Sequence, residues 1–319
     1  MLRSLAFATL AVLLGTASAV AQQPPETAPP APPTAESAPS PAAAPLPVQP
    51  APDRGDFKVV YEKLKSPDDK ELQEIFRGTQ LLEETAKALN EKLALPADVT
   101  ISPRECGAAD ATYEADKRRI SICYELVGGF AELFLRASGK APDASQAGAA
   151  VAAATLFALF HETGHALIDL YKLPVAGKAE EAADQIATLV LLGSGKEGGT
   201  TAVDSASTLL AQARNAEVKA RLAKVPFWNG HGFDEVRLAD ILCWAYGRDP
   251  EAFQDLVGDG TLPAARAPGC AAESAAIAKA WAEPLAPYLK GWTLAPPPPP
   301  PAPSEPLSPL PPSSPPPTP

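Results

Sequence analysis

The motif HExxH at residues 161–165, written HETGH, constrains this chain more than any other stretch. Apolar residues flank the motif on both sides and predict a buried helix. Because an α-helix turns by about 100° per residue, His161 and His165 share one face. Two imidazoles on one face can hold a zinc ion, and Glu162 is close enough to act on a water bound there. The motif therefore predicts a zinc site with Glu162 as general base.

A catalytic zinc site needs a third protein ligand, and the next predicted helix supplies candidates. Pro174 and Gly177 break the first helix, and residues 179–192 read as a second helix that folds back on it. Glu180 and Asp184 are four residues apart and share a face. We expect Glu180 to bind the metal, and Asp184 to accept a hydrogen bond from the far ring nitrogen of a ligating histidine.

The scarcity of histidine strengthens this interpretation, because an isolated HExxH is more often ordinary helix surface. The chain has 3 histidines, and two of them lie in the motif. On an apolar helix, an imidazole pair needs partners, since burial of an unsatisfied polar group costs about 1–3 kcal/mol. The pattern favours a metal site over a chance match.

An HExxH helix followed by a helix with ExxxD resembles the gluzincin metallopeptidases, which include the thermolysin-like enzymes. The resemblance implies that His161, His165 and Glu180 bind zinc and that Asp184 supports a histidine. It also implies a peptidase activity, with Zn²⁺ as the cofactor and a peptide or protein as the substrate.

Two departures qualify the resemblance. The interval between His165 and the ExxxD helix is shorter than is usual in gluzincins, which leaves Glu181 or Asp184 open as the third ligand. The metzincin pattern is excluded, because Ile168 and Tyr171 stand where its glycine and third histidine should be.

A second resemblance covers roughly residues 57–292. The runs HETGHALIDLYKLPVAGKAEEAADQIA and FWNGHGFDEVRLADILCWAYGRDP are similar to a bacterial family of unknown function described as putative metallopeptidases. Together with the pattern of helices and strands, the two resemblances predict an α+β, helix-dominated, zincin-like domain with a small β unit over residues 54–294.

The N-terminus has the pattern of a signal peptide over residues 1–21. Arg3 precedes an apolar run at residues 5–14, and small residues lead to an expected cleavage after Ala21. The run is too short for an ordinary membrane span of about 20 residues. We expect an exported protein, periplasmic or extracellular, without stable membrane insertion after cleavage. An uncleaved membrane anchor is the alternative.

Proline concentrates outside the predicted domain. Residues 22–53 and 295–319 together hold 27 of the 38 prolines. Such segments cannot pack a core and should be disordered and extended. We interpret them as spacer and tail. The alternative is that they dock on a cell-envelope partner.

The cysteines and strands predict how the β unit is built. In an exported protein, 4 cysteines suggest two disulfides, which we pair as Cys106 with Cys123 and Cys243 with Cys270. Strands are expected at residues 57–61, 99–102 and 119–124. By zincin architecture, the last of these would be an exposed edge strand that pairs with an extended substrate, and a plain core strand is the alternative.

The remaining helices follow the apolar periodicity. We expect loops at residues 138–147 and a flexible link at residues 193–201. The helices expected apart from residues 179–192 are 70–95, 125–136, one from about residue 148 through the motif, 206–223, 237–247, 250–257 and 271–289.

His231 is the third histidine, in an aromatic stretch at residues 225–233. Peptide hydrolysis needs a cationic or hydrogen-bonding group opposite the base to stabilise the oxyanion. We expect His231 in that catalytic role, with Arg237 as a substitute. The alternative is that His231 caps the following helix or hydrogen-bonds to backbone within the turn.

Charge excludes one class of partner. The net charge is −11, and no basic stripe is present that could displace counterions from a nucleic acid. The leading prediction is an exported zinc-dependent peptidase. The alternative is a noncatalytic binding or scaffold protein that keeps a metallopeptidase-like core.

Overall fold

The computed structural model describes residues 49–137, 144–193, 196–214, 224–232 and 234–294. Three predicted segments fall outside these ranges. They are the signal peptide at residues 1–21, residues 22–48 of the N-terminal proline-rich segment, and the proline-rich tail at residues 295–319. Helices dominate the described part, which confirms the α+β class. The strands are β1 Phe57–Val59, β2 Val99–Arg104, β3 Ala111–Glu114 and β4 Arg119–Cys123. The helices are α1 Pro67–Thr79, α2 Leu81–Lys92, α3 Tyr124–Ala137, α4 Ala144–Tyr171, α5 Ala179–Gly193, α6 Lys196–Ala213, α8 Pro226–Gly230, α9 Glu235–Arg248, α10 Asp255–Gly258 and α11 Ala267–Leu285, with a 3₁₀ turn at Ala286–Tyr288.

The described strands form one sheet in the order β1-β2-β4-β3. The pairs β1–β2 and β2–β4 are parallel, whereas β3 runs antiparallel to β4 with Thr112 opposite Ser121. The expectation of an exposed edge strand at residues 119–124 is therefore wrong. The reason is that β3, in the stretch between the expected strands 99–102 and 119–124, pairs along the outer side of β4 and becomes the end strand itself.

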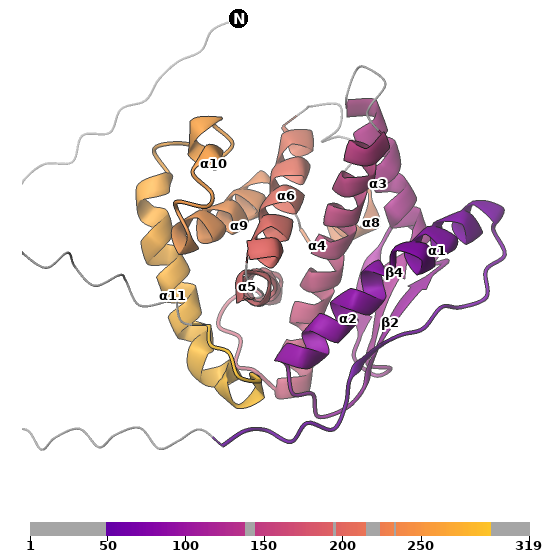
Figure 1. The fold of residues 1–319 in the computed structure, drawn as a ribbon, viewed down its shortest axis with the longest axis horizontal. Coiled ribbons are helices and arrows are strands. Elements are labelled where there is room, and N and C mark those ends of the chain that lie inside the picture. The colour runs from indigo at the N-terminus through magenta and orange to yellow at the C-terminus, as the bar shows by residue number, and fades with distance from the viewer. Residues whose placement is uncertain (1–48, 138–143, 194–195, 215–223, 233, 295–319) are drawn as a thin grey trace, which may run out of the picture. The chain divides into compact units, whose positions relative to one another are not determined.

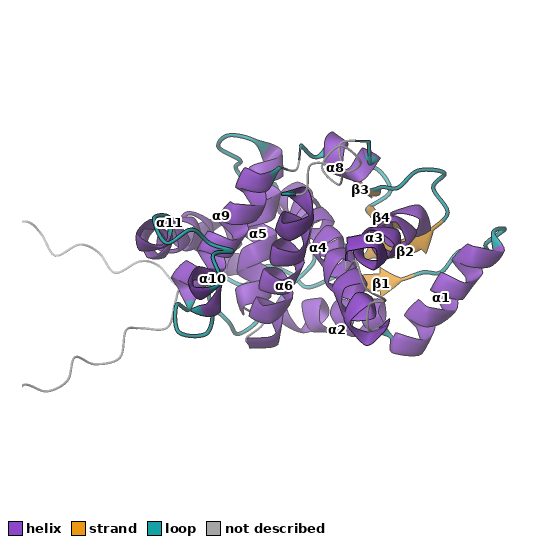
Figure 2. Cartoon of the chain, turned by 90° about the horizontal axis from the view of Figure 1, so that it is seen from above, coloured by secondary structure: helices purple, strands orange, loops and turns teal. Residues whose placement is uncertain are grey.

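Helix α4 occupies the middle of the described fold (Figures 1 and 2). It packs against α3, β3 and β4 on one side and against α5 and α6 on the other. Side chains on opposite sides of α4, such as Phe157 and Leu159, are buried, which is why the helix is apolar all round. By length and composition Gly148–Tyr171 could cross a membrane, but 67% of its apolar window is buried inside the structure. That burial is typical of a core helix.

Two helix predictions at the N-terminal side were wrong in their boundaries. The expected single helix at residues 70–95 is divided into α1 and α2 at Gln80, whose φ of 54° is left-handed and ends α1. Helix α4 begins at Ala144, four residues before the expected start at about 148. The apolar periodicity located α1, α2 and α4. It does not mark the single left-handed residue that divides α1 from α2.

The predicted flexible link at residues 193–201 was also wrong from residue 196 onward, where α6 begins. The glycines suggested a linker, but Gly199 is buried inside α6. A Cβ added there would lie 3.0 Å from the ring of Phe253, so the glycine allows close packing. Helix α6 ends at Ala213, and residues 215–223 of the predicted helix lie outside the described ranges. The predictions at residues 125–136, 179–192 and 237–247 match α3, α5 and α9.

Two disulfides link the elements around the core. Cys106 in the loop after β2 is joined to Cys123 at the end of β4, and Cys243 of α9 is joined to Cys270 of α11. These are the pairs expected from the sequence. Disulfides are typical of proteins in oxidising compartments, so the pair indicates an extracellular or periplasmic protein.

Candidate metal centre

Three ligand-type side chains converge where α5 packs against α4. His161 Nε2 lies 3.2 Å from His165 Nε2 and 3.1 Å from Glu180 Oε2, and His165 Nε2 lies 3.5 Å from Glu180 Oε1. Ligands about 2.0–2.2 Å from a tetrahedral zinc ion are separated from one another by about 3.3–3.5 Å. The spacing of these three side chains therefore fits one face of a zinc tetrahedron.

The hydrogen-bond pattern of His161 also fits a cation. Its Nδ1 donates to Asp184 Oδ1 at 2.8 Å, which leaves the Nε2 lone pair of the neutral ring directed at Glu180 and His165. Lone pairs that face one another repel unless a proton or a metal ion lies between them. His161 is fully buried, and burial opposes its protonation, but Asp184 and Glu180 outweigh that effect and raise its pKa to about 9. The donor set thus attracts positive charge.

Glu180 is the acidic residue of α5 that faces both histidines. Burial would raise its pKa, but the hydrogen bonds and charges of His161 and His165 hold that pKa well below the usual range. Glu181 is exposed and hydrogen-bonds with Gln185 at 3.4 Å. Asp184 lies on the far side of His161, at Nδ1. Of the three acidic candidates left open by the sequence, Glu180 is the one positioned with the motif histidines.

Glu162 and His231 face each other beside this cluster. His231 Nε2 lies 3.0 Å from Glu162 Oε1, and the His231 Nδ1 donates to the carbonyl of Phe227 at 2.9 Å. Burial opposes protonation of His231, but the Glu162 carboxylate outweighs it and raises the pKa of His231. Glu162 is 1% exposed, and its Oε1 has no hydrogen bond of good geometry within the described residues. A buried carboxylate oxygen in this state has lone pairs available for a further hydrogen-bond donor, such as a water molecule.

The sequence offered two hypotheses for His231, a catalytic role and a hydrogen bond to backbone, and the geometry is compatible with both. The ring is anchored to backbone within the aromatic turn, and its other nitrogen points into the cluster. A nitrogen or oxygen from each of His161, His165, Glu180 and His231 can be chosen so that all four lie within 4.8 Å of one another.

Arg237 braces the cluster from α9. Its guanidinium contacts Asp184 Oδ2 at 2.6 Å and 2.7 Å and donates to the carbonyl oxygens of His231 and Glu180. One side chain therefore ties α9 to α5 and to the turn after α8. The sequence analysis gave Arg237 only a substitute catalytic role and missed this structural one.

Asp110 was missed entirely. Asp110 immediately precedes β3 and lies close enough to His231 and Glu162 for their charges to shift its pKa. Burial raises its pKa and the Glu162 charge adds to the rise, whereas the Ala111 N–H and His231 lower it. Only the pairing of β3 brings this residue to the centre, so no local pattern could have identified it.

The cluster opens into a cavity of about 420 Å³. Its lining includes Glu180 and His231 from the cluster and Lys178, Asp234, Val236 and Asp240 around it. An accessible side is what separates a catalytic zinc site from a closed structural one. The residues present thus fit a zinc ion, and the cluster is accessible from the side of Glu180 and His231.

A protein family described as "Putative metallopeptidase" matches residues 61–285. No curated protein and no solved structure matches the chain significantly. The matched region begins just after β1, runs to the end of α11 and includes every residue of the cluster. The chain therefore belongs to this metallopeptidase family.

Proposed function

We propose that this protein is an exported, zinc-dependent peptidase. His161, His165 and Glu180 hold the zinc, and Glu162 is the general base. The observation that carries the proposal is the convergence of the three ligand side chains, with ligand-type atoms 3.1–3.5 Å apart, beside the buried carboxylate of Glu162, which is not one of the three. Family membership supports a peptidase activity at a coarser level.

Zinc in such a site lowers the pKa of a water molecule toward neutrality and polarises a carbonyl oxygen. Glu162 accepts the proton of the attacking water and passes it to the leaving amine. His231, whose pKa is raised by Glu162, offers an N–H to the oxyanion of the transition state. Asp184 holds His161 in the tautomer that leaves Nε2 free for the metal.

The substrate is a peptide or protein in extended form. Strand β3 ends the described sheet and packs against α4, so its outer edge is the place for backbone pairing with substrate. This assigns to β3 the role that the sequence analysis gave to residues 119–124.

Export accords with the two disulfides. We propose that residues 1–21 direct it, and that the proline-rich segments serve as spacers or contact a cell-envelope partner.

The test combines elemental analysis with peptide cleavage by purified protein beginning at Gln22. Glu162→Gln should retain about one zinc per chain and lose turnover, because it removes the base and keeps the ligands. His161→Ala and Glu180→Ala should lose the zinc. Glu181→Gln is the matched control for metal binding, since Glu181 is exposed and adjacent to Glu180, and it should retain the zinc. Cleavage by Glu162→Gln at the wild-type rate would refute the mechanism.

A further inference from the structure

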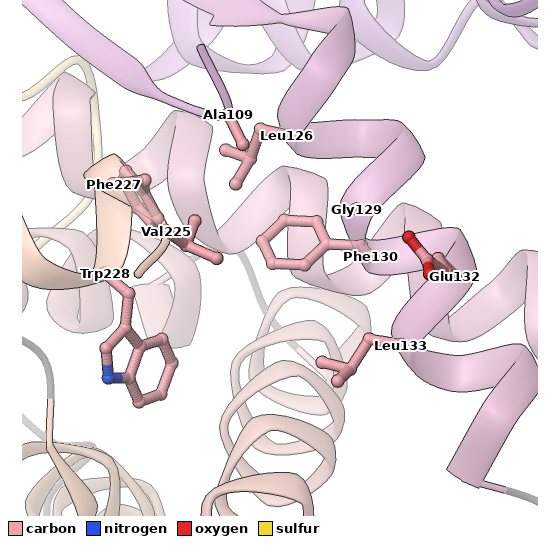
Figure 3. Close-up of a pocket in the computed structure, with 9 residues that line it drawn as sticks. All are labelled: Ala109, Leu126, Gly129, Phe130, Glu132, Leu133, Val225, Phe227 and Trp228. Carbon is pink, nitrogen blue, oxygen red and sulfur yellow. The ribbon is translucent and has the colours of Figure 1, made fainter. Parts of the chain in front are cut away.

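A second cavity, of about 160 Å³, lies between α3 and the α8 turn, and its walls are apolar (Figure 3). Side chains from α3 and from the turn face one another across it, with the ring of Phe130 directed toward Val225 and Phe227. The apolar walls are Leu126, Phe130, Leu133, Val225, Phe227 and Trp228.

The size and chemistry of this cavity suit one large apolar side chain. A protein cavity of about 150 Å³ with aliphatic and aromatic walls accommodates a molecule the size of benzene. Leu126, Phe130, Leu133, Phe227 and Trp228 are each at most 8% exposed, so a guest side chain would leave water almost completely. Ala109, Gly129 and Glu132 also border the cavity, and they keep more of their surface exposed. Ala109 borders the cavity on the side toward β3.

The cavity adjoins the candidate catalytic residues through Phe227. One side of the Phe227 ring belongs to the cavity wall, while the ring centroid lies 4.9 Å from that of His231 and 6.3 Å from that of His161. The same residue donates its backbone N–H to the carbonyl of Ala109 at 3.2 Å. Thus the cavity lies between the metal centre and the chain segment that leads into β3.

This location matches the path of a substrate strand. Ala109 precedes the first residue of β3 by two positions, which corresponds to about 6.6 Å of extended chain. A peptide paired along β3, with its scissile carbonyl at Glu162 and His231, passes the Ala109 side of the cavity within one or two residues of the cleaved bond. Its side chains alternate in direction, so one of them can enter the cavity.

Resting on the proposed peptidase function, we infer that the α3–α8 cavity is a specificity pocket for a large apolar side chain, such as leucine or phenylalanine, next to the scissile bond. Affinity for that side chain comes from burial of apolar surface against Phe130, Leu133 and Trp228.

Two neighbouring glycines of α3 allow a matched test. A Cβ added at Gly128 or at Gly129 meets nothing within 4 Å, but only Gly129 is among the residues that line the cavity. Gly129→Leu should narrow the cavity, and Gly128→Leu should leave it unchanged. Both substitutions replace a helical glycine, so neither should destabilise α3. If Gly129→Leu fails to fold, Val225→Phe narrows the cavity from the opposite wall.

The assay compares zinc-loaded proteins on peptides that differ only in having Phe, Leu or Ala beside the cleaved bond. It also compares binding of the Phe and Ala peptides to Glu162→Gln, with and without each glycine substitution. Wild type should prefer Phe or Leu over Ala by at least about 10-fold in kcat/KM, and the binding preference should agree. Gly129→Leu should reduce both preferences to about twofold, whereas Gly128→Leu should retain them.

The outcomes separate the two proposals. If wild type cleaves peptides but shows no apolar preference, or if both leucine variants keep the preference, the pocket assignment is wrong and the peptidase function stands. If Gly128→Leu and Gly129→Leu lose the apolar preference equally, the assignment is also wrong, since such a loss would not depend on the cavity. If zinc-loaded wild type cleaves no peptide, the proposed function fails, and the pocket assignment fails with it.

Discussion

Gly164 of the HExxH motif lies against the backbone of Ala183, so that a Cβ added to Gly164 would be 2.5 Å from the Ala183 carbonyl oxygen and 2.9 Å from its Cα. This contact joins α4 to α5 beside the candidate ligands. Glu180 and Asp184 reach His161 only because the two backbones approach this closely. The residue between the two histidines of the motif is therefore part of the construction of the centre.

Gly164→Ala should disrupt that construction. The added methyl group requires α5 to move away from α4, which should destabilise the fold by about 1–3 kcal/mol and separate Glu180 from the histidines. We expect a lower melting temperature and a weaker zinc affinity. Gly148→Ala, at a position in the same helix where a Cβ meets nothing within 4 Å, is the control and should do neither. Wild-type zinc affinity in Gly164→Ala would contradict the role of this contact.

The juxtaposition of His161, His165 and Glu180 could be predicted from the sequence because its geometry is local. Helical spacing alone places His161 and His165 on one face, and a single reversal of the chain after Pro174 returns Glu180 to them. The apolar pattern of α4 likewise follows from burial on all sides. The helix-dominated class and the family followed from the same stretch.

The other half of the centre depends on contacts between distant segments. Asp110 lies near the centre because β3 pairs outside β4. Phe227 lies beside Ala109 because its N–H donates to the Ala109 carbonyl. Four residues of strand β3, between polar turns, carry too short an alternation to be distinguished from a loop. The edge role was consequently assigned to residues 119–124 instead of β3.

Asp184→Asn should weaken zinc binding without removing a ligand. Asp184 is 2% exposed and connects His161 Nδ1, at 2.8 Å, to the guanidinium of Arg237, at 2.6 Å. The amide keeps the shape but loses the charge that orients His161 and that pairs with Arg237. We expect zinc affinity to fall by about 10–100-fold, as measured by competition with a chromophoric chelator. Glu181→Gln should not change it, and equal losses in the two variants would argue against a specific role for Asp184.

The metal-free protein should lose stability as the pH rises from about 6.5 to about 9. Burial lowers the pKa of His161, but Asp184 and Glu180 raise it to about 9, above the usual 6.5. A pKa raised by folding stabilises the fold fully below the unfolded value, and this contribution disappears as the pH passes the folded value. Melting temperatures of chelator-treated protein at pH 6 and pH 9.5 should therefore fall with pH. The fall should be smaller in His161→Gln, and an equal fall in both proteins would exclude His161 as its source.

His231→Gln distinguishes an open catalytic site from a closed one. His231 Nε2 lies 3.0 Å from Glu162, within the same group of ligand-type atoms as the two motif histidines. If His231 stabilises the oxyanion, the substitution should lower kcat by about 10²–10³-fold and leave about one zinc per chain. If His231 is instead a fourth zinc ligand, the variant should lose zinc affinity, and chelation of wild type should unfold the protein, because a structural metal contributes directly to folding. Elemental analysis and circular dichroism before and after chelation decide between these outcomes. Retained zinc with reduced kcat supports the peptidase, whereas lost zinc favours the noncatalytic alternative.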